Sequence, residues 1–340
     1  MLDIQENVDL KNFSTMKIGG RARYFAVIES NADIVEGCLY AQKNNVPYIV
    51  VGSGSNMIWS DTLHNIFLFE NKIHGFETID EDDTSVTIRV GAGENWDETV
   101  SHCVELGLSG IEAMSAIPGT VGATPVQNVG AYGQEIQNTI LSVEVYDTVV
   151  CEFRNLSNTE CKFGYRDSIF KSEEKGKYII LRVVLHLSKF PPVQPKYPSV
   201  VTYFKEKNIT TPSLEEIRHA VIEIRKNKLP DPKTIPNCGS FFKNPIVEKN
   251  IVDKLLLEYP SIQYFVIDEN FMKISAGWLL EMCGLKGAEM GRMKLYDANA
   301  LVLTNPNGAS FADLVNAKEH IIDMVREKFG ITLEIEPNIV

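Results

Sequence analysis

A glycine-rich segment in the first half of the chain constrains the fold most. Residues 107–136, "GLSGIEAMSAIPGTVGATPVQNVGAYGQEI", contain six glycines and two prolines but few charged side chains. Glycine and proline both disfavour helix interiors, so this run suits neither a regular helix nor a continuous strand. Long irregular segments inside compact domains usually have a function. The sequence therefore predicts a backbone folded against a flat, bulky cofactor, with an irregular buried connection as the alternative.

A second glycine-rich turn follows an apolar run near the amino terminus. In "VVGSGSNMIWSD" (50–61), backbone N–H groups and serine hydroxyls could approach a phosphate with no side chain in the way. The segment lacks the spacing of the GxGxxG fingerprint and the lysine of a P-loop. By itself it indicates either a tight turn or a phosphate cradle.

Composition limits the class of protein. The 340 residues are 44% hydrophobic and 23% charged, enough to bury at least one full core and to divide into two or three lobes. A net charge of −12 argues against nucleic acid as a partner. The sequence shows no basic start followed by an apolar run and no stretch of membrane-span length, so we expect a cytoplasmic protein.

The cysteines and tryptophans point to no separate chemistry. The six cysteines lack CxxC spacing and no histidine cluster completes a metal set, so we expect reduced, buried thiols and no metal. Trp59, Trp96 and Trp278 are expected to fill the core or cover the surface instead of stacking on a ligand.

Hydrophobic periodicity predicts a mixture of helices and strands. Residues 31–45 carry apolar positions at helical spacing after Asn31, which we expect to be the N-cap, between strands at 24–30 and 46–51. Further strands are predicted at 85–93, 140–149 and 178–187.

The composition changes after residue 190. The four prolines of "KFPPVQPKYPSV" (189–200) predict an extended loop or linker. Ser213, followed three residues later by Glu216, matches a capping box that starts a helix over 213–228. Its expected buried face consists of Leu214, Ile217, Val221, Ile222 and Ile224.

The stretch "NCGSFFKNP" (237–245) places a serine, a lysine and an asparagine around two adjacent phenylalanines. A buried strand would hide its apolar residues and carry few polar ones. This segment is therefore predicted to present its polar groups to a ligand.

Six segments together carry a family resemblance. In order, they are "NFSTMKIGG", "VVGSGSNMI", "GIEAMSAIPGTVGATPVQNVGAYGQEI", "FGYRDSIFK", "GSFFKNP" and "SAGWLLEMCGLKG". The set spans nearly the whole chain and resembles the UDP-N-acetylenolpyruvoylglucosamine reductase family, FAD enzymes of peptidoglycan precursor synthesis. The first half also resembles the wider flavin fold of vanillyl-alcohol oxidase.

The resemblance implies an α+β architecture. Two FAD-binding subdomains of the vanillyl-alcohol oxidase type would precede a smaller α+β substrate-binding domain. The chain would divide into subdomain 1 (1–75), subdomain 2 (76–190), a loop carrying a substrate-closing tyrosine, as in the family's longer subtype (191–212), the substrate-binding domain (213–325) and a carboxyl-terminal segment returning to the active site (326–340).

The resemblance also implies the cofactor site. The loop "GSGSN" would hold the FAD pyrophosphate, and Arg225 would touch the flavin ring, with a solvated helix face as the alternative for Arg225. The residues implied to bind FAD are Gly52, Ser53, Gly54, Ser55, Asn56, Met57, Ser115, Ile117, Gly119, Thr120, Gly122, Val129, Gly130 and Arg225.

Three catalytic residues are implied by the same resemblance. Ser240 would donate the proton that follows hydride addition, and Arg166 would pair with the substrate carboxylate, with a surface ion pair to Asp167 as its alternative. Glu334 and Glu336 share one face of a strand, and the pattern L-x-x-E selects Glu336. Pro337 and Asn338 follow it where the family usually has valine and arginine, and a proline confines the strand to an edge.

The implied substrate-binding residues come from both halves of the chain. Tyr165 would contact the substrate or its pyrophosphate, and Lys228 and Asn244 would bind the diphosphate of the nucleotide. Asn299 would lie near the substrate, although a helix-to-strand turn explains this residue equally well. Tyr197 is expected to be the tyrosine that closes over the substrate, with Tyr203 as the rival.

The implied activity is reduction of UDP-N-acetylglucosamine enolpyruvate to UDP-N-acetylmuramate, with FAD as cofactor and NADPH as co-substrate. We expect a monomer that binds neither nucleic acid nor membrane. An FAD oxidase of the vanillyl-alcohol type and a nucleotide-binding regulatory protein without catalysis are the alternatives.

Overall fold

The computed structural model describes residues 2–340. Their contacts group into two compact units, between which the chain alternates. Unit 1 contains residues 2–8, Ala22–Ser53 and Leu63–Arg225, and unit 2 contains Asp9–Arg21, Gly54–Thr62 and Lys226–Val340. The five-part division expected from the sequence stays a prediction.

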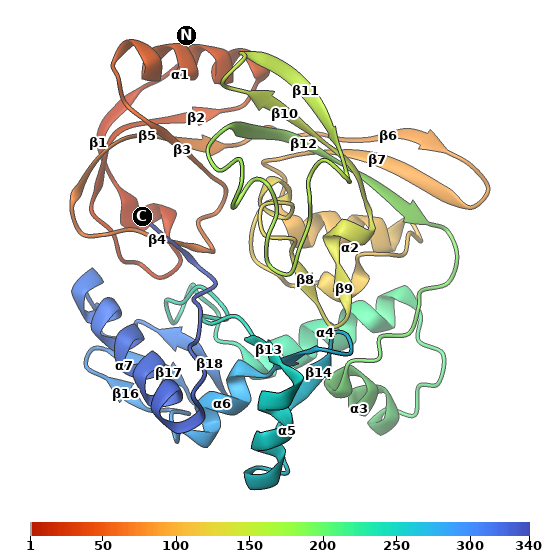
Figure 1. Ribbon diagram of the computed structural model, residues 1–340. Helices are drawn as coiled ribbons and strands as arrows, with labels where there is room; N and C mark the ends of the chain where they lie inside the picture. Colours follow the sequence, from red (N-terminus) through yellow and green to blue (C-terminus); the bar gives the residue numbers. More distant parts are fainter. Residues whose placement is uncertain (1) are drawn as a thin grey trace. The chain divides into compact units, whose positions relative to one another are not determined.

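The first sheet of unit 1 has strand order β1-β2-β5-β3, and α1 packs against it (Figure 1). Its elements are β1 (Gln5–Asp9), β2 (Arg21–Ile28), α1 (Asn31–Lys43), β3 (Tyr48–Val51) and β5 (Leu63–Asn71). The helix predicted over 31–45 is confirmed, but Asn31 is not its N-cap. Ser30 takes that place, because its hydroxyl accepts the N–H of Asp33 while the Asp33 carboxylate accepts the N–H of Glu29.

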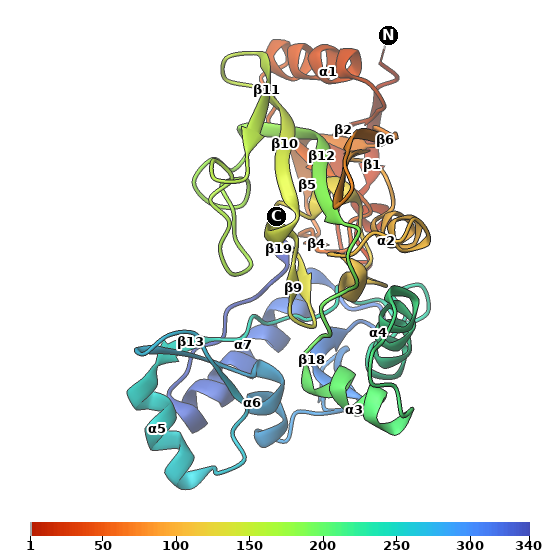
Figure 2. The ribbon, with the colours of Figure 1, turned by 90° about the vertical axis from the view of Figure 1, so that its right-hand side faces the viewer.

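The second sheet of unit 1 is antiparallel, with strand order β11-β10-β12-β7-β6 (Figure 2). Its strands are β6 (Phe76–Glu81), β7 (Ser85–Gly91), β10 (Ile140–Asp147), β11 (Glu152–Ser157) and β12 (Tyr178–Ser188). The strands predicted at 85–93, 140–149 and 178–187 are confirmed. Helix α2 (Trp96–Glu105) packs on this sheet, and its Trp96 is almost fully buried in the shared core.

The glycine-rich segment contains only short pieces of regular structure, as predicted. They are the 3₁₀ turns Glu112–Met114, Val121–Ala123 and Ile136–Asn138 and the two-residue strands β8 (Gly130–Ala131) and β9 (Gln134–Glu135).

Helix α3 (Pro198–Glu206) and all but the last turn of helix α4 (Leu214–Lys228) complete unit 1, and α3 was not predicted. Helix α3 begins inside the proline-rich stretch 189–200 and lies within the expected loop at 191–212. Its first residue is a proline, which is compatible with a helix start because the N–H of that position has no partner within the helix. Helix α4 (Leu214–Lys228) begins at the predicted capping box, in which Ser213 and Glu216 exchange bonds of 2.8 and 3.2 Å. The two helices share an apolar cluster that includes Phe204 and Ile217.

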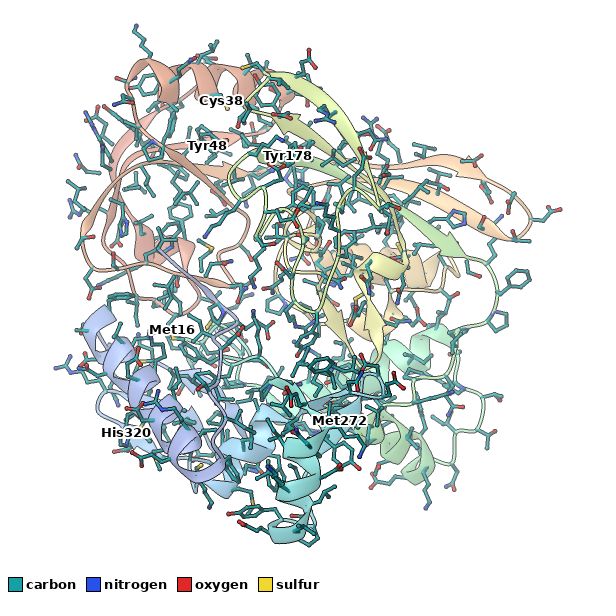
Figure 3. The ribbon with its side chains drawn as sticks, in the orientation of Figure 1. Met16, Cys38, Tyr48, Tyr178, Met272 and His320 are labelled. Atoms are coloured by element: carbon teal, nitrogen blue, oxygen red, sulfur yellow. The ribbon has the colours of Figure 1, made fainter. Side chains whose placement is uncertain are left out.

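Unit 2 builds its core from three separate parts of the chain. Met16, which Figure 3 labels, and Ile58 are fully buried among side chains of residues 238–333. The unit contains β4 (Met57–Ile58), β13 (Ile246–Glu248), α5 (Lys249–Glu258), β14 (Tyr264–Val266), β15 (Phe271–Ile274), α6 (Ala276–Met282), β16 (Glu289–Met290), β17 (Met293–Tyr296), β18 (Asn299–Thr304), α7 (Phe311–Phe329) and β19 (Asn338–Ile339). Trp59 and Trp278 are buried in this unit, so all three tryptophans lie in the core as expected.

Within residues 2–340, no helix is both long enough and apolar enough to cross a membrane.

Candidate active and cofactor-binding site

In unit 1 the first predicted cofactor loop lies against the second. Gly52 follows β3, and a Cβ atom built on it would lie 2.2 Å from the hydroxyl of Thr120. Gly122 is equally crowded, since its Cβ would lie 2.5 Å from that of Ala92. The fold therefore brings the two glycine-rich segments together in space, and it does so at positions where a side chain would not fit.

In unit 2 the rest of the loop is held by the "NFST" segment near the amino terminus. Gly54 has a positive φ of 70°, and its carbonyl accepts the N–H of Thr15 at 3.2 Å. The Ser14 hydroxyl donates to the carbonyl of Met57 at 2.7 Å, and the Thr15 hydroxyl to that of Ser55 at 3.3 Å. These bonds fix the path of residues 54–57.

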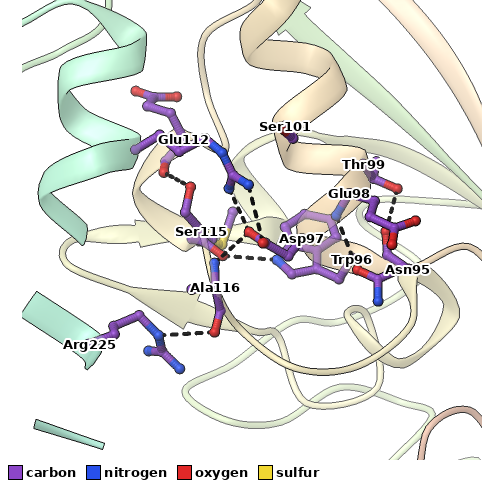
Figure 4. Close-up of polar contacts among 12 residues, drawn as sticks. Asn95, Trp96, Asp97, Glu98, Thr99, Ser101, Glu112, Ser115, Ala116 and Arg225 are labelled. Carbon is purple, nitrogen blue, oxygen red and sulfur yellow. Dashed lines mark hydrogen bonds and ion pairs between the residues drawn. The ribbon is translucent and has the colours of Figure 1, made fainter. Parts of the chain in front are cut away.

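The Ser115–Thr120 stretch is clamped by helices α2 and α4 (Figure 4). Ala116 has a positive φ of 58°; its N–H donates to the Asp97 carboxylate at 2.6 Å, and its carbonyl accepts Arg225 Nε at 3.2 Å. Ser115 is fully buried and donates its hydroxyl to the carbonyl of Glu112 at 2.6 Å. The N–H of Trp96 donates to the carbonyl of Gly119 at 3.1 Å.

Arg166 also lies next to a predicted cofactor residue. It occupies a tight turn in which Gly164 and Asp167 pair, and its own φ is 54°. The guanidinium donates from Nη2 to the carbonyl of Gly130 at 2.9 Å and lies 5.5 Å from the centre of the Tyr165 ring. The Asp167 carboxylate accepts the N–H of Ser168 and the hydroxyl of Ser172.

Tyr197 and Tyr203 differ clearly in their surroundings. Tyr203 donates its hydroxyl to Glu223 at 2.7 Å, and burial, followed by this bond, raises its pKa to about 12. Tyr197 directly precedes α3, is 40% exposed and packs edge-on against the ring of Tyr132 at 5.3 Å. Tyr132 in turn lies near enough to Arg225 for the two side chains to interact electrostatically. Tyr203 is therefore bound to α4, whereas Tyr197 lies beside the clamped segment.

In unit 2 the two phenylalanines of the "GSFF" motif anchor Ser240. Phe241 and Phe242 are buried with their rings 5.0 Å apart, and the N–H of Phe241 donates to the carbonyl of Leu301 at 2.8 Å. Before the serine, Gly239 has a φ of 74° and its N–H donates to the side chain of Asn237. Ser240 itself is half-buried between these two fixed points.

The two candidate glutamates of the tail have different partners. Glu334 is 76% exposed and forms an ion pair with Lys243 at 3.2 Å. Glu336 is half-buried, its N–H donates to the carbonyl of Phe241 at 2.9 Å, and its charge, after burial, helps raise the pKa of Cys238. Of the two glutamates, Glu336 is therefore the one whose backbone pairs with the residue next to Ser240.

The tail continues from Glu336 to the cofactor loop. Pro337 is buried, and the strand that follows it, β19, pairs in parallel with β4. The N–H of Asn338 donates to the carbonyl of Asn56, and the N–H of Val340 donates to the carbonyl of Ile58, both at 3.0 Å. The proline thus directly precedes an edge strand, where its missing N–H costs no ladder bond.

The remaining predicted substrate residues are spread over unit 2. Lys228 is exposed at the end of α4. Asn244 accepts the first N–H of α6, that of Ala276, at 2.9 Å. Asn299 accepts the N–H of Leu301 at 3.1 Å in the turn that joins β17 to β18, so the turn is strand-to-strand and the helix-to-strand alternative is wrong.

The cysteines do not offer a nucleophile at this site. Burial raises the pKa of Cys103 and Cys161 to about 12 and raises that of Cys238 as well. Cys151 is exposed, so the expectation of buried thiols is wrong for this residue. A thiol with a raised pKa is a poor nucleophile at neutral pH.

Several residues of the arrangement were missed by sequence reasoning. Asp97, Tyr132 and Arg218 connect segments that lie up to 121 residues apart. No local pattern marks such contacts, because they exist only once the chain has folded.

Comparison with known proteins identifies the family. Residues 22–149 match the model of an FAD binding domain, and residues 231–340 match that of the UDP-N-acetylenolpyruvoylglucosamine reductase C-terminal domain. The UDP-N-acetylenolpyruvoylglucosamine reductase of Flavobacterium johnsoniae is 37% identical over 340 residues, which cover 100% of both chains. The chain belongs to the UDP-N-acetylenolpyruvoylglucosamine reductase family. The reductase of Pseudomonas fluorescens is also 37% identical, over 99% of each chain.

A solved structure of the reductase family shares the fold. The UDP-N-acetylenolpyruvylglucosamine reductase of Thermus caldophilus aligns over 100% of this chain and 99% of its own with a TM-score of 0.70 and 22% identity. The predicted α+β class, with an FAD-binding fold and a separate carboxyl-terminal domain, is confirmed.

The residues present fit the FAD of the reductase family. Around Gly52 in unit 1, the donors are peptide N–H groups and the hydroxyls of Ser53 and Thr120, and residues 52–57 include no carboxylate. Such a donor set suits a pyrophosphate. Arg225 adds a cation beside Ala116.

Proposed function

We propose that the chain catalyses the reaction of its family, the reduction of UDP-N-acetylglucosamine enolpyruvate to UDP-N-acetylmuramate by NADPH, in peptidoglycan precursor synthesis. The observation that carries this proposal is the full-length match at 37% identity to curated reductases. Bound FAD, once reduced by NADPH, supplies the hydride for the terminal carbon of the enol ether.

Residues of this chain then donate the proton and stabilise the negative charge of the substrate. Ser240 donates a proton to the carbon bearing the carboxylate, and its rigid turn supports the role because a general acid has to be held at a fixed position. Glu336 polarises the serine hydroxyl. Arg166 pairs with the substrate carboxylate, for which a planar guanidinium offers two parallel donors.

The nucleotide is held by a second set of residues. Lys228 and Asn244 take the diphosphate, Tyr165 contacts the substrate, Asn299 lies near it, and Tyr197 closes over it. The exposure of Tyr197 and the binding of Tyr203 to Glu223 support the choice of Tyr197. NADPH also carries a pyrophosphate, so the two ligands use these residues in turn. Parallel double-reciprocal plots are expected, and intersecting lines would count against shared occupancy.

Both substrates are nucleotides of the cytoplasm, and we place the chain there, as a monomer without nucleic acid or membrane partners. The oxidase alternative is disfavoured by the match of residues 231–340 to the reductase carboxyl-terminal domain, which an oxidase would not require. A regulatory protein would bind the UDP-sugar without consuming NADPH.

An anaerobic experiment tests the proposal directly. The purified protein is expected to be yellow, to bleach on addition of NADPH and to recover its flavin spectrum when the enolpyruvyl nucleotide is added. Recovery on admission of oxygen but not on addition of the nucleotide would support the oxidase instead. Binding of UDP-sugar without bleaching would support the regulatory protein.

A further inference from the structure

Ala116 adopts a backbone conformation that an alanine does not favour. Its φ of 58° lies in the left-handed region, where the Cβ atom approaches the following carbonyl. The residue stands between Ser115 and Ile117, both predicted to line the cofactor. A conformation of this kind persists only where neighbouring groups hold it in place.

Asp97 holds the N–H side of Ala116. Its Oδ1 accepts this N–H at 2.6 Å, from the first turn of α2, where the helix dipole favours a negative charge. Arg218 of α4 binds both oxygens of the carboxylate, at 2.5 and 3.2 Å. Burial alone would raise the pKa of Asp97, but the bonds from Arg218 and Ala116 and the charges of Arg218 and Arg225 outweigh it and lower the pKa. The group is thus a carboxylate at neutral pH.

Arg225 holds the opposite side of the same residue. Its Nε donates to the Ala116 carbonyl at 3.2 Å (Figure 4), so one peptide turn is fixed by an anion at its N–H and a cation at its carbonyl. Arg218 and Arg225 lie two turns apart on α4, which lets one helix support both contacts.

We propose that Asp97 is a positioning residue for the cofactor: by holding Ala116 in its left-handed turn, it gives the Ser115–Ile117 backbone the shape that FAD binds. Asp97 reaches the cofactor only through Ala116. The inference rests on the proposed function, because it needs FAD to lie against this backbone.

Flavin affinity of the apoprotein tests the idea, with fluorescence titration of FAD as the measurement. Asp97→Ala is expected to raise the FAD dissociation constant about tenfold or more, the usual effect of losing a charge-assisted hydrogen bond. Glu98→Ala is the matched control, since Glu98 is an exposed carboxylate in the same helical turn, and it should leave the constant within about twofold.

A second substitution shows whether Asp97 acts by positioning Ala116 or only by supporting α4. Glycine adopts positive φ readily, so Ala116→Gly in the Asp97→Ala background is expected to recover most of the lost affinity. A loss that Ala116→Gly does not relieve would overturn the proposal, as would an Asp97→Ala affinity equal to that of Glu98→Ala.

Two further measurements distinguish a failure of this proposal from a failure to fold or to bind FAD. Thermal unfolding of each apoprotein shows whether Asp97→Ala folds. If it does not, Asp97→Asn replaces it, because the amide lacks the negative charge and the second acceptor oxygen that Arg218 Nη2 uses, and a several-fold loss relieved by Ala116→Gly is expected. An unmodified chain that binds no FAD at all would contradict the proposed function itself, which is a different result from either failure above.

Discussion

Three non-glycine residues in or beside the predicted site of unit 1 have left-handed backbone. Ala116, Tyr132 and Arg166 all have φ between 50° and 58°. A non-glycine residue in this conformation costs about 1 kcal/mol, which contacts with neighbouring groups have to offset. Asp97 and Arg225 hold Ala116, and the carbonyl of Gly130 holds Arg166. The protein therefore maintains the shape of this region before any ligand arrives.

Replacing Ser240 by alanine separates the two half-reactions. Flavin reduction by NADPH is expected to proceed nearly as before, because it needs no proton from this residue, whereas the second half-reaction slows about a hundredfold or more. Stopped-flow absorbance in single turnovers measures each half. Equal slowing of both halves would remove Ser240 from its proposed role.

Replacing Gly52 by alanine tests the contact between the two glycine-rich segments. The new Cβ would lie 2.2 Å from the Thr120 hydroxyl and 3.0 Å from its methyl group, so one segment has to shift. We expect weaker FAD retention on gel filtration. Gly277→Ala is the control, since the nearest atom there is 3.7 Å away and alanine favours a helix. Equal flavin content in both variants would show that the contact does not matter.

At the scale of elements, the carboxyl-terminal tail pairs with two separate segments of unit 2. Residues 334–336 pair with 241–243, and residues 338–340 pair with 56–60. The tail thus links the Ser240 turn to residues 54–57 of the predicted phosphate loop through backbone pairing. Backbone hydrogen bonds hold the chain on both sides of Glu336.

The turn between β10 and β11 gives unit 1 a pH dependence. The Asp147 side chain is buried, accepts the N–H groups of Val149 and Val150 and pairs with Arg154 at 3.3 Å. Burial opposes the charge, but these bonds and Lys177 prevail and lower the pKa of Asp147. Its stabilising effect is therefore present above the unfolded pKa of about 4 and is lost as the pH falls toward the folded value.

Asp147→Asn should remove this dependence. At pH 7 the variant is expected to be less stable by about 1 kcal/mol, with the difference shrinking toward pH 3, as measured by urea unfolding at both values. Glu152→Gln changes an exposed carboxylate of the same turn and serves as control. A difference that stays constant with pH would contradict the assignment.

Much of the fold was predictable where the signals are local. The α4 capping box and the apolar runs of β7, β10 and β12 lie in short stretches of sequence, so both were predicted correctly. Helix α3 was missed because the prolines before and at its first residue indicate a loop, although proline suits a first turn. Motifs selected the site residues, yet the link from Asp97 to Ala116 and that from Tyr197 to Tyr132 depend on tertiary packing, which no stretch of sequence reveals.

At the scale of the whole molecule, the chain passes back and forth between the two units. This limits which fragments of the chain can fold alone. Unit 2 needs Met16, Ile18 and Ile58, all fully buried, although most of it lies beyond residue 225. Removing three large apolar side chains from a core costs several kcal/mol, comparable with the whole stability of a domain.

A fragment of residues 226–340 is therefore expected not to fold alone. Circular dichroism on heating should show a broad, uncooperative change, whereas the full chain should melt sharply. A sharp transition in the fragment would show that the two amino-terminal segments are dispensable for the core.

The parallel pairing of β19 with β4 has a consequence for synthesis on the ribosome. Met57 is translated long before its partner Asn338. Unit 2 thus stays open until residue 338 has been translated, and Ile58 waits for the residues of 238–333 that bury it. During this time the exposed apolar side chains of the nascent chain invite chaperone binding.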